Sequence, residues 1–243
     1  MAKRLDESPS ARGRFGYTRA AMRLLYHFPL DPHSRKVRLA LKEKQLEFAL
    51  ELERPWERRE PFLALNPAGE IPVLVEPDGH AFAESTAICE LLEERYPELP
   101  LLGSDMVSRA EVRRLVGWFD HKFHHEVTRN LVDEKIGKRL AGRGGPDSAA
   151  IRAGKANIRT HLDYIGWLSD RRCWLAGDQV SLADLAAAAQ LSAVDYLGDV
   201  PWGDHPEAKD WYARVKSRPS FRPLLADHIP GVPPPPHYAD LDF

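Results

Sequence analysis

Short apolar runs alternate with helical patterns through the first hundred residues of the chain. Residues 24–28 and 48–52 each form an apolar run of strand length, and the segment between them keeps its apolar residues on one helical face. We expect Ser34 to cap that helix, which should end near Lys44. A right-handed crossover through this helix would make the two strands parallel.

A hairpin and a second helix are predicted to complete this part of the chain. The apolar runs at 73–75 and 81–83 flank a Pro-Asp-Gly turn, which is a hairpin signal. A helix is expected from Ser85 to about Arg95. Strand, helix, strand, hairpin and helix is the order of a thioredoxin-like domain, which we place at residues 22–97.

Beyond residue 104 the periodicity is helical throughout. A long first helix is indicated by an apolar stripe with a 3.6-residue repeat. The stripe consists of Val112, Leu115, Val116, Phe119 and Phe123. A glycine-rich break at 142–146 separates it from a second long helix at about 148–168. A further helix is expected at 206–217, followed by a last turn that Pro219 and Pro223 bracket.

The sequence Ser181-Leu182-Ala183-Asp184 forms a capping box ahead of a very apolar run, residues 185–191. Such a run must be buried on nearly all sides, so it predicts a central helix. The fold class is therefore α/β plus all-α, with an all-helical domain over 104–226 after a linker.

The two ends of the chain lie outside these patterns. Residues 1–21 carry four arginines and lack the apolar stretch of a secretory signal. We interpret them as a flexible extension or as residues upstream of a start at Met22, with a functional basic arm as the alternative. Residues 227–243 form a Pro-rich tail, in which the prolines at 233–236 favour a stiff polyproline II spacer.

The tail ends in closely spaced apolar and acidic residues. The spacer would present Tyr238, Leu241 and Phe243 among Asp240, Asp242 and the terminal carboxylate. One interpretation is that the tail packs back across the cleft of its own chain. The other is that the tail, or the surface on which it docks, engages a protein partner.

Composition excludes several classes of protein. The formal net charge of -2 gives no electrostatic reason to expect nucleic acid or an anionic membrane as the main partner. The two cysteines, Cys89 and Cys173, are far apart, which argues against a disulfide framework or a thiolate metal site and fits a reducing cytoplasm. No apolar run approaches the length of a membrane span, so no membrane insertion is expected.

The richest chemical signal lies at residues 66–88. The bond Ile71-Pro72 leads from a loop into an apolar strand, and a cis peptide is expected there, which would turn neighbouring backbone groups outward to pair with an extended peptide. Glu84 and Ser85 stand where a strand gives way to a helix, whose free N–H groups attract a carboxylate. A peptide-pairing edge beside a carboxylate-binding helix start is the layout of a glutathione site.

On these motifs the chain resembles the glutathione transferase superfamily over residues 22–226. The resemblance implies a thioredoxin-like domain followed by a transferase-type helical domain, a homodimer, and glutathione as a cosubstrate rather than a resident cofactor. It assigns Ile71, Pro72, Glu84 and Ser85 to the glutathione-like site.

The position that carries the chemistry in this family is changed. The family uses a Tyr, Ser or Cys near the start of the first helix to stabilise the glutathione thiolate. Here Asp31 and His33 occupy the serine and cysteine positions, and a carboxylate beside a thiolate would raise the thiol pKa. Ser34 keeps a hydroxyl and is the remaining catalytic candidate, with helix capping as its alternative role. Tyr26 lies inside the first strand.

Other segments resemble the bacterial FtsZ-localised, transferase-like cell-division proteins (FzlA). These segments are the loop 56–59, Trp118-Phe119-Asp120, the block 195–202 and the ending 238–243. The resemblance implies a cytoplasmic dimer that binds FtsZ filaments at the division site and regulates constriction without efficient transferase activity. It assigns partner contacts to Trp56, Asp240, Leu241 and Phe243.

A glutathione-dependent transferase or isomerase remains the alternative function, so whether the chain is an enzyme is left open.

His121 and His125 have an i, i+4 spacing that suits a metal. Without further ligands at suitable spacing, no metal is expected. Cys89, one turn into its helix, is expected to be buried and inert.

Overall fold

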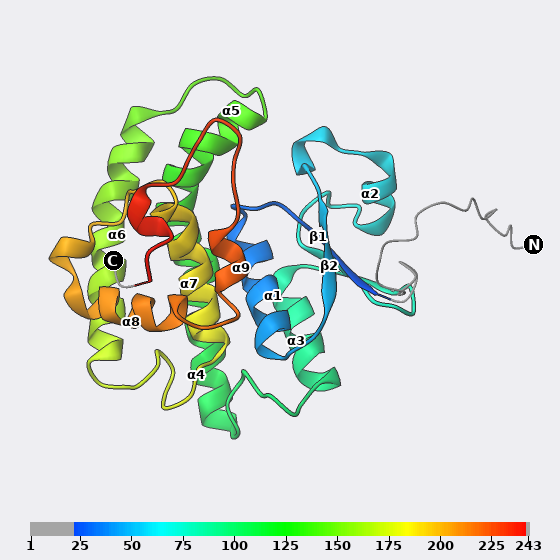
Figure 1. Cartoon of the computed structure of the whole chain (residues 1–243), viewed down its shortest axis with the longest axis horizontal. Helices are drawn as coiled ribbons and strands as arrows, with labels where there is room; N and C mark the ends of the chain where they lie inside the picture. Colours follow the sequence, from blue (N-terminus) through cyan, green and yellow to red (C-terminus); the bar gives the residue numbers. More distant parts are fainter. Residues whose placement is uncertain (1–21, 242–243) are drawn as a thin grey trace, which may run out of the picture.

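The computed structural model describes residues 22–241. The predicted extension 1–21 and the candidate contact Phe243 lie outside the described residues. Within them the chain forms a small sheet domain followed by a helical domain, as the sequence patterns predicted (Figure 1). No helix within 22–241 is long and apolar enough to cross a membrane.

The sheet has four strands in the order β2-β1-β3-β4. They are β1 (Arg23–His27), β2 (Phe48–Leu52), β3 (Val73–Val75) and β4 (Ala81–Ala83). Strand β1 pairs with β2 in parallel and with β3 antiparallel, and β3 and β4 form the expected hairpin.

Two helices lie between the sheet and the helical domain, namely α1 (Pro32–Glu43) and α3 (Ser85–Arg95) (Figure 1). The short elements η2 (Pro55–Glu57, a 3₁₀ turn) and α2 (Glu60–Leu65) connect β2 to β3.

The start of α1 differs from the prediction. Asp31, not Ser34, is its N-cap, and the Asp31 carboxylate accepts a hydrogen bond from the Ser34 N–H at 2.6 Å. Pro32 occupies the first turn, where its missing N–H costs nothing, so the helix begins earlier than the sequence pattern suggested. Ser34 therefore falls inside the helix and is fully buried.

The helical domain begins with one continuous helical stretch, and α6 is the second long helix predicted after the glycine-rich break. The first stretch consists of α4 (Met106–Gly117), the π-helical η3 (Trp118–Gly137) and α5 (Lys138–Leu140). The later elements are α6 (Ser148–Ser169), α7 (Leu182–Asp195), the turn η4 (Trp202–Asp204), α8 (Pro206–Lys216), α9 (Arg222–Leu225) and the turn η5 (Pro236–Tyr238).

The predicted apolar stripe is buried along α4 and η3, since Val112, Leu115, Val116, Phe119 and Phe123 all lie in the core. The same face of η3 continues with buried Val127 and Leu131. At the end of η3 the N–H of Lys138 bonds to the carbonyl of Asp133, five residues earlier, which is the π-helical pattern.

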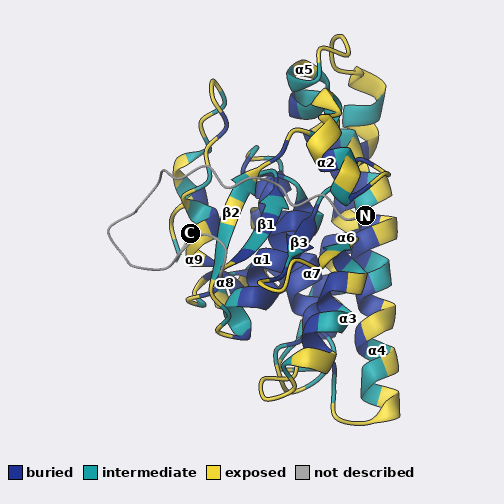
Figure 2. Ribbon diagram, turned by 90° about the vertical axis from the view of Figure 1, so that its right-hand side faces the viewer, coloured by how far each residue is buried: buried dark blue, intermediate teal, exposed yellow. Residues whose placement is uncertain are grey.

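Helix α7 is the centre of the domain, and every one of its residues is buried (Figure 2). The predicted capping box is present, with Asp184 accepting from the Ser181 N–H at 3.0 Å and Ser181 accepting from the Ala183 N–H at 3.3 Å. Asp184 also accepts from the indole N–H of Trp211 at 3.0 Å. Helix α1 packs against α7, so the two domains share a core.

The tail packs on its own chain. Tyr238 is fully buried rather than presented to solvent, and Lys216 donates to the His237 carbonyl at 3.0 Å. Pro235 has the dihedral angles of polyproline II, with φ of -66° and ψ of 156°, and residues 236–238 then form a 3₁₀ turn. Tyr238 thus anchors the tail, and after it Asp240 is exposed and Leu241 is half-buried.

A buried arginine connects the tail to both domains. The Arg35 guanidinium, fully enclosed, donates to Tyr238 Oη (3.1 Å), Ser192 Oγ (2.8 Å) and Asp227 Oδ2 (3.2 Å). Its Nε donates to the Pro29 carbonyl at 2.6 Å. Four separate parts of the chain thus meet at one side chain.

We expect Tyr238→Phe to lower the free energy of unfolding by about 1–2 kcal/mol, because it removes a hydrogen bond to a buried cation. Urea denaturation measures this change. Tyr26→Phe is the matched control, since the described structure gives the Tyr26 hydroxyl no hydrogen bond. Equal effects of the two substitutions would contradict the assigned role of Arg35.

Candidate functional site

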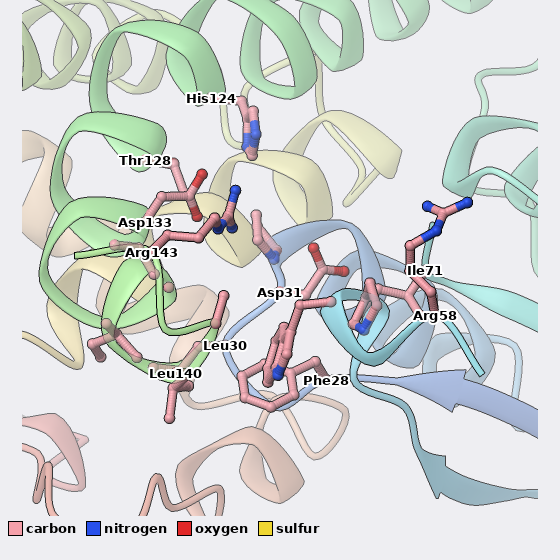
Figure 3. Close-up of a pocket in the computed structure, with 17 residues that line it drawn as sticks. Phe28, Leu30, Asp31, Arg58, Ile71, His124, Thr128, Asp133, Leu140 and Arg143 are labelled. Carbon is pink, nitrogen blue, oxygen red and sulfur yellow. The ribbon is translucent and has the colours of Figure 1, made fainter. Parts of the chain in front are cut away.

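A cavity of about 600 Å³ lies between the two domains (Figure 3). Its first wall comes from the loop after β1, which contributes Phe28, Leu30 and Asp31, and from Trp56 and Ile71. The rings of Phe28 and Trp56 meet edge to face with centroids 5.2 Å apart. Because Arg35 binds the Pro29 carbonyl within this loop, the anchored tail and the cavity wall are tied to the same side chain.

The opposite wall is a single row of side chains at four-residue spacing. The row consists of His124, Thr128, Val132, Ile136 and Leu140. Four of the five belong to η3, and Leu140 belongs to α5. Their position at the cavity depends on how the two domains pack, which a periodic pattern in the sequence does not reveal.

Predicted peptide-binding residues are only partly brought to the cavity. The Ile71-Pro72 bond is cis, as expected, and Ile71 lines the cavity while Pro72 is buried. Glu84 and Ser85 do not line it. Trp56 does, whereas η5 and the described residues after it lie beside α6 and α8, on the far side of the helical domain from α2 (Figure 1). Asp240 and Leu241 therefore lie apart from Trp56.

At the start of α3 the chain's own carboxylate, that of Glu84, binds two of the backbone N–H groups. Glu84, with φ of 73°, is the N-cap and accepts from the N–H groups of Thr86 at 2.8 Å and Ala87 at 3.0 Å. Burial opposes ionisation of Glu84, but these hydrogen bonds outweigh it and lower its pKa. Ser85 Oγ donates to Glu84 at 3.2 Å.

Hydroxyl groups are scarce at the cavity. Ser34 is fully buried, does not line the cavity, and its Oγ has no hydrogen-bond partner among the described residues. Thr128 is the one hydroxyl among the lining residues of 22–241, and it donates to Gln190 Oε1 at 2.6 Å. At the start of α1 the cavity meets Asp31 instead, whose carboxyl pKa is raised by burial.

A polar cluster beneath the cavity was not predicted from the sequence. Lys36 of α1 and Asp120 of η3 form a buried ion pair that joins the two domains. His33 packs on His124 with ring centroids 4.8 Å apart, and its Nδ1 lies 3.8 Å from Asp120. Burial, aided by His33, lowers the pKa of His124 to about 4, so His124 is neutral at physiological pH.

Neither a metal site within residues 22–241 nor a reactive thiol at Cys89 is indicated. The structure places no group of three potential metal ligands together there, although His121 and His125 have a suitable spacing. Cys89 is buried as expected, and burial raises the pKa of its thiol to about 12, so the thiolate does not form at neutral pH.

Comparison with known proteins agrees with this architecture. Residues 25–100 match the glutathione S-transferase N-terminal domain, and residues 159–219 match the C-terminal domain. Glutathione S-transferase 3 of Zea mays is 33% identical over 87% of this chain and 96% of its own length. The chain belongs to the glutathione S-transferase family.

Within the family, the chain is 54% identical to FtsZ-localized protein A of Caulobacter vibrioides, over 91% of this chain and 98% of that protein. The solved structure of FzlA from C. crescentus superposes with a TM-score of 0.88, and it covers 91% of this chain and 100% of its own. A glutathione S-transferase from Rhodospirillum rubrum F11 gives 0.90 with 61% identity and the same coverage. The resemblance inferred from the motifs is therefore confirmed.

We expect Asp31→Asn to raise the free energy of unfolding at neutral pH relative to the parent chain. Asparagine can still accept from the Ser34 N–H, and it removes a charge that burial disfavours. Burial raises the pKa of Asp31 in the folded chain above its ordinary value of 3.8. The free energy of unfolding of the parent therefore falls as the pH rises from 3.8 through the folded pKa of Asp31, whereas that of the variant does not. Urea denaturation between pH 3 and 8 measures the difference.

Asp105→Asn is the matched control. Asp105 is the exposed N-cap of α4, and hydrogen bonds from Ser108 and Val107 lower its pKa. Asp105→Asn should therefore lose stability at neutral pH relative to its parent, the opposite sign. Asp31→Asn following the same trend would contradict the buried carboxyl.

Proposed function

We propose that this protein is a cytoplasmic homodimer that binds FtsZ filaments at the division site and regulates constriction, without efficient transferase activity. The observation that carries the proposal is the start of α1. There the Asp31 carboxyl, which caps the helix, occupies the position at which the family stabilises a thiolate. The nearby Ser34 hydroxyl is buried in the core. The extensive identity to FtsZ-localized protein A supports the partner.

Trp56 is the contact on which the proposal is tested. Its indole stands at the cavity wall against Phe28, and it is half-buried, so a partner could cover the rest of the ring. Large aromatic side chains in such positions contribute strongly to interfaces. The tail contacts are proposed at Asp240, Leu241 and Phe243. Asp240 and Leu241 lie apart from η2, so they would form a separate part of the interface.

Co-sedimentation with assembled FtsZ measures the binding. Trp56→Ala should weaken it by about tenfold or more, the loss of one aromatic anchor. Trp167→Ala is the matched control, since Trp167 is half-exposed on α6 away from the cavity. Deleting 239–243 keeps the Tyr238 anchor and tests the tail alone. Full binding after this deletion removes the tail from the interface, and no sedimentation of the parent chain contradicts the function.

A glutathione-dependent transferase is the second candidate, and two observations favour it. Ile71, the predicted peptide-pairing residue, lines the cavity, and the 61% identical relative from R. rubrum bears the name glutathione S-transferase. In that case Ile71, Glu84 and Ser85 would hold the peptide.

We expect glutathione titration calorimetry to give no heat of tight binding and a standard conjugation assay to give little turnover, because no free hydroxyl of the described residues faces the cavity. The variant Ser34→Ala should leave any residual turnover unchanged, since Ser34 is enclosed. Brisk conjugation that Ser34→Ala abolishes would establish the enzyme instead.

A further inference from the structure

We propose that the interdomain cavity receives an acidic, apolar segment of the partner, whose carboxylates bind Arg58 and Arg143 on opposite sides of the opening. This inference rests on the proposed function and adds the chemistry of the occupant. The occupant is an extended protein segment that inserts a large apolar side chain between two carboxylate-bearing neighbours.

The two arginines are the first ground for this proposal. Arg58 follows η2 in the sheet domain, and Arg143 belongs to the loop after α5 (Figure 3). Both are exposed, and neither guanidinium forms a hydrogen bond or ion pair with another residue of 22–241. Many exposed arginines of this chain are paired, as Arg113 is with Glu90 at 2.8 Å. Two arginines that line one cavity and have no ion-pair partner among residues 22–241 favour an anionic occupant.

The acidic residues of the cavity do not cancel these charges. Asp31 accepts a backbone hydrogen bond, and burial favours its neutral form. Asp133 lies on the helical side, where it interacts with both Arg129 and Arg143. Burial also raises the pKa of Asp133, so both acidic residues of the cavity lining are shifted toward the neutral form while Arg58 and Arg143 stay charged.

The interior of the cavity determines the rest of the occupant. Phe28, Leu30 and Trp56 face Ile136 and Leu140 across it, so an apolar side chain would be enclosed from both domains. A volume near 600 Å³ is that of a typical ligand pocket. The carboxylates of the occupant would remain at the opening, within reach of the arginines.

Arg143 is carried on a loop that can adjust to an occupant. Gly142 and Gly144 flank it with φ of 65° and 91°, conformations that glycine adopts at no steric cost. A Cβ added at either glycine would meet no atom within 4 Å, so the loop is not packed against the domain. Figure 3 shows Arg143 extending from this loop toward the middle of the cavity.

Charge substitution tests this arrangement in the full chain. We expect Arg58→Gln and Arg143→Gln each to weaken co-sedimentation with FtsZ filaments by roughly three- to fivefold, the effect of one partly exposed charge pair. The double variant R58E/R143E should lose more than about tenfold, and its deficit should shrink as salt is added. Arg143→Lys should retain most of the binding. Arg152→Glu, an exposed and unpaired position on α6, is the control and should bind like the parent.

The outcomes separate the two levels of the proposal. If the parent chain sediments with filaments and R58E/R143E does so equally well, the arginine-lined receptor is wrong while the function stands. If the double variant and Arg152→Glu lose binding alike, the effect is one of overall charge, and the receptor is again wrong. If the parent does not sediment at all, both fail. Equal thermal midpoints by circular dichroism show that the variants are folded.

Discussion

The burial of one guanidinium, that of Arg35, constrains the rest of the structure. A fully enclosed cation is tolerated only when its donors are satisfied, and here four segments supply the acceptors. Asp227 provides the compensating charge, Ser192 the contact to the central helix, Tyr238 the tail and Pro29 the cavity loop. None of these can leave without exposing an unpaired donor, so the tail, the shared core and the cavity wall form one cooperative unit.

Local sequence signals predicted much of the fold because each has a local cause. Alternating apolar runs gave the four strands, a Pro-Asp-Gly turn gave the hairpin, and Ser181 with Asp184 gave the start of the buried helix. The errors arose where two local signals competed or where packing decided. Asp31 and Ser34 are both good caps, and Pro32 settled the choice. Tyr238 looked exposed because its partner, Arg35, lies two hundred residues earlier.

The cavity was less predictable than the fold. Trp56 and Ile71 could be named from their loops, but the row from His124 to Leu140 lines a cavity whose position depends on how the two domains pack. The Lys36–Asp120 pair likewise requires knowing how the two domains pack. The position of Arg58 and Arg143 at the cavity could not be predicted either, because they lie on loops of different domains and meet only in the folded chain.

Two helix starts near the cavity explain why a family fold could take up another role. The positive end of a helix favours an anion, and the resemblance to transferases places a thiolate near α1 and a peptide carboxylate near α3. In this chain Asp31 and Glu84 fill those positions with their own carboxyl groups, at 2.6 Å and 2.8 Å from the backbone N–H groups. A glutathione molecule would have to compete for these N–H groups with the carboxyl groups of Asp31 and Glu84, which belong to the same chain and therefore have a far higher local concentration. What remains for an occupant is the apolar interior and the arginines at its opening, which suit a protein segment better than a small thiol peptide.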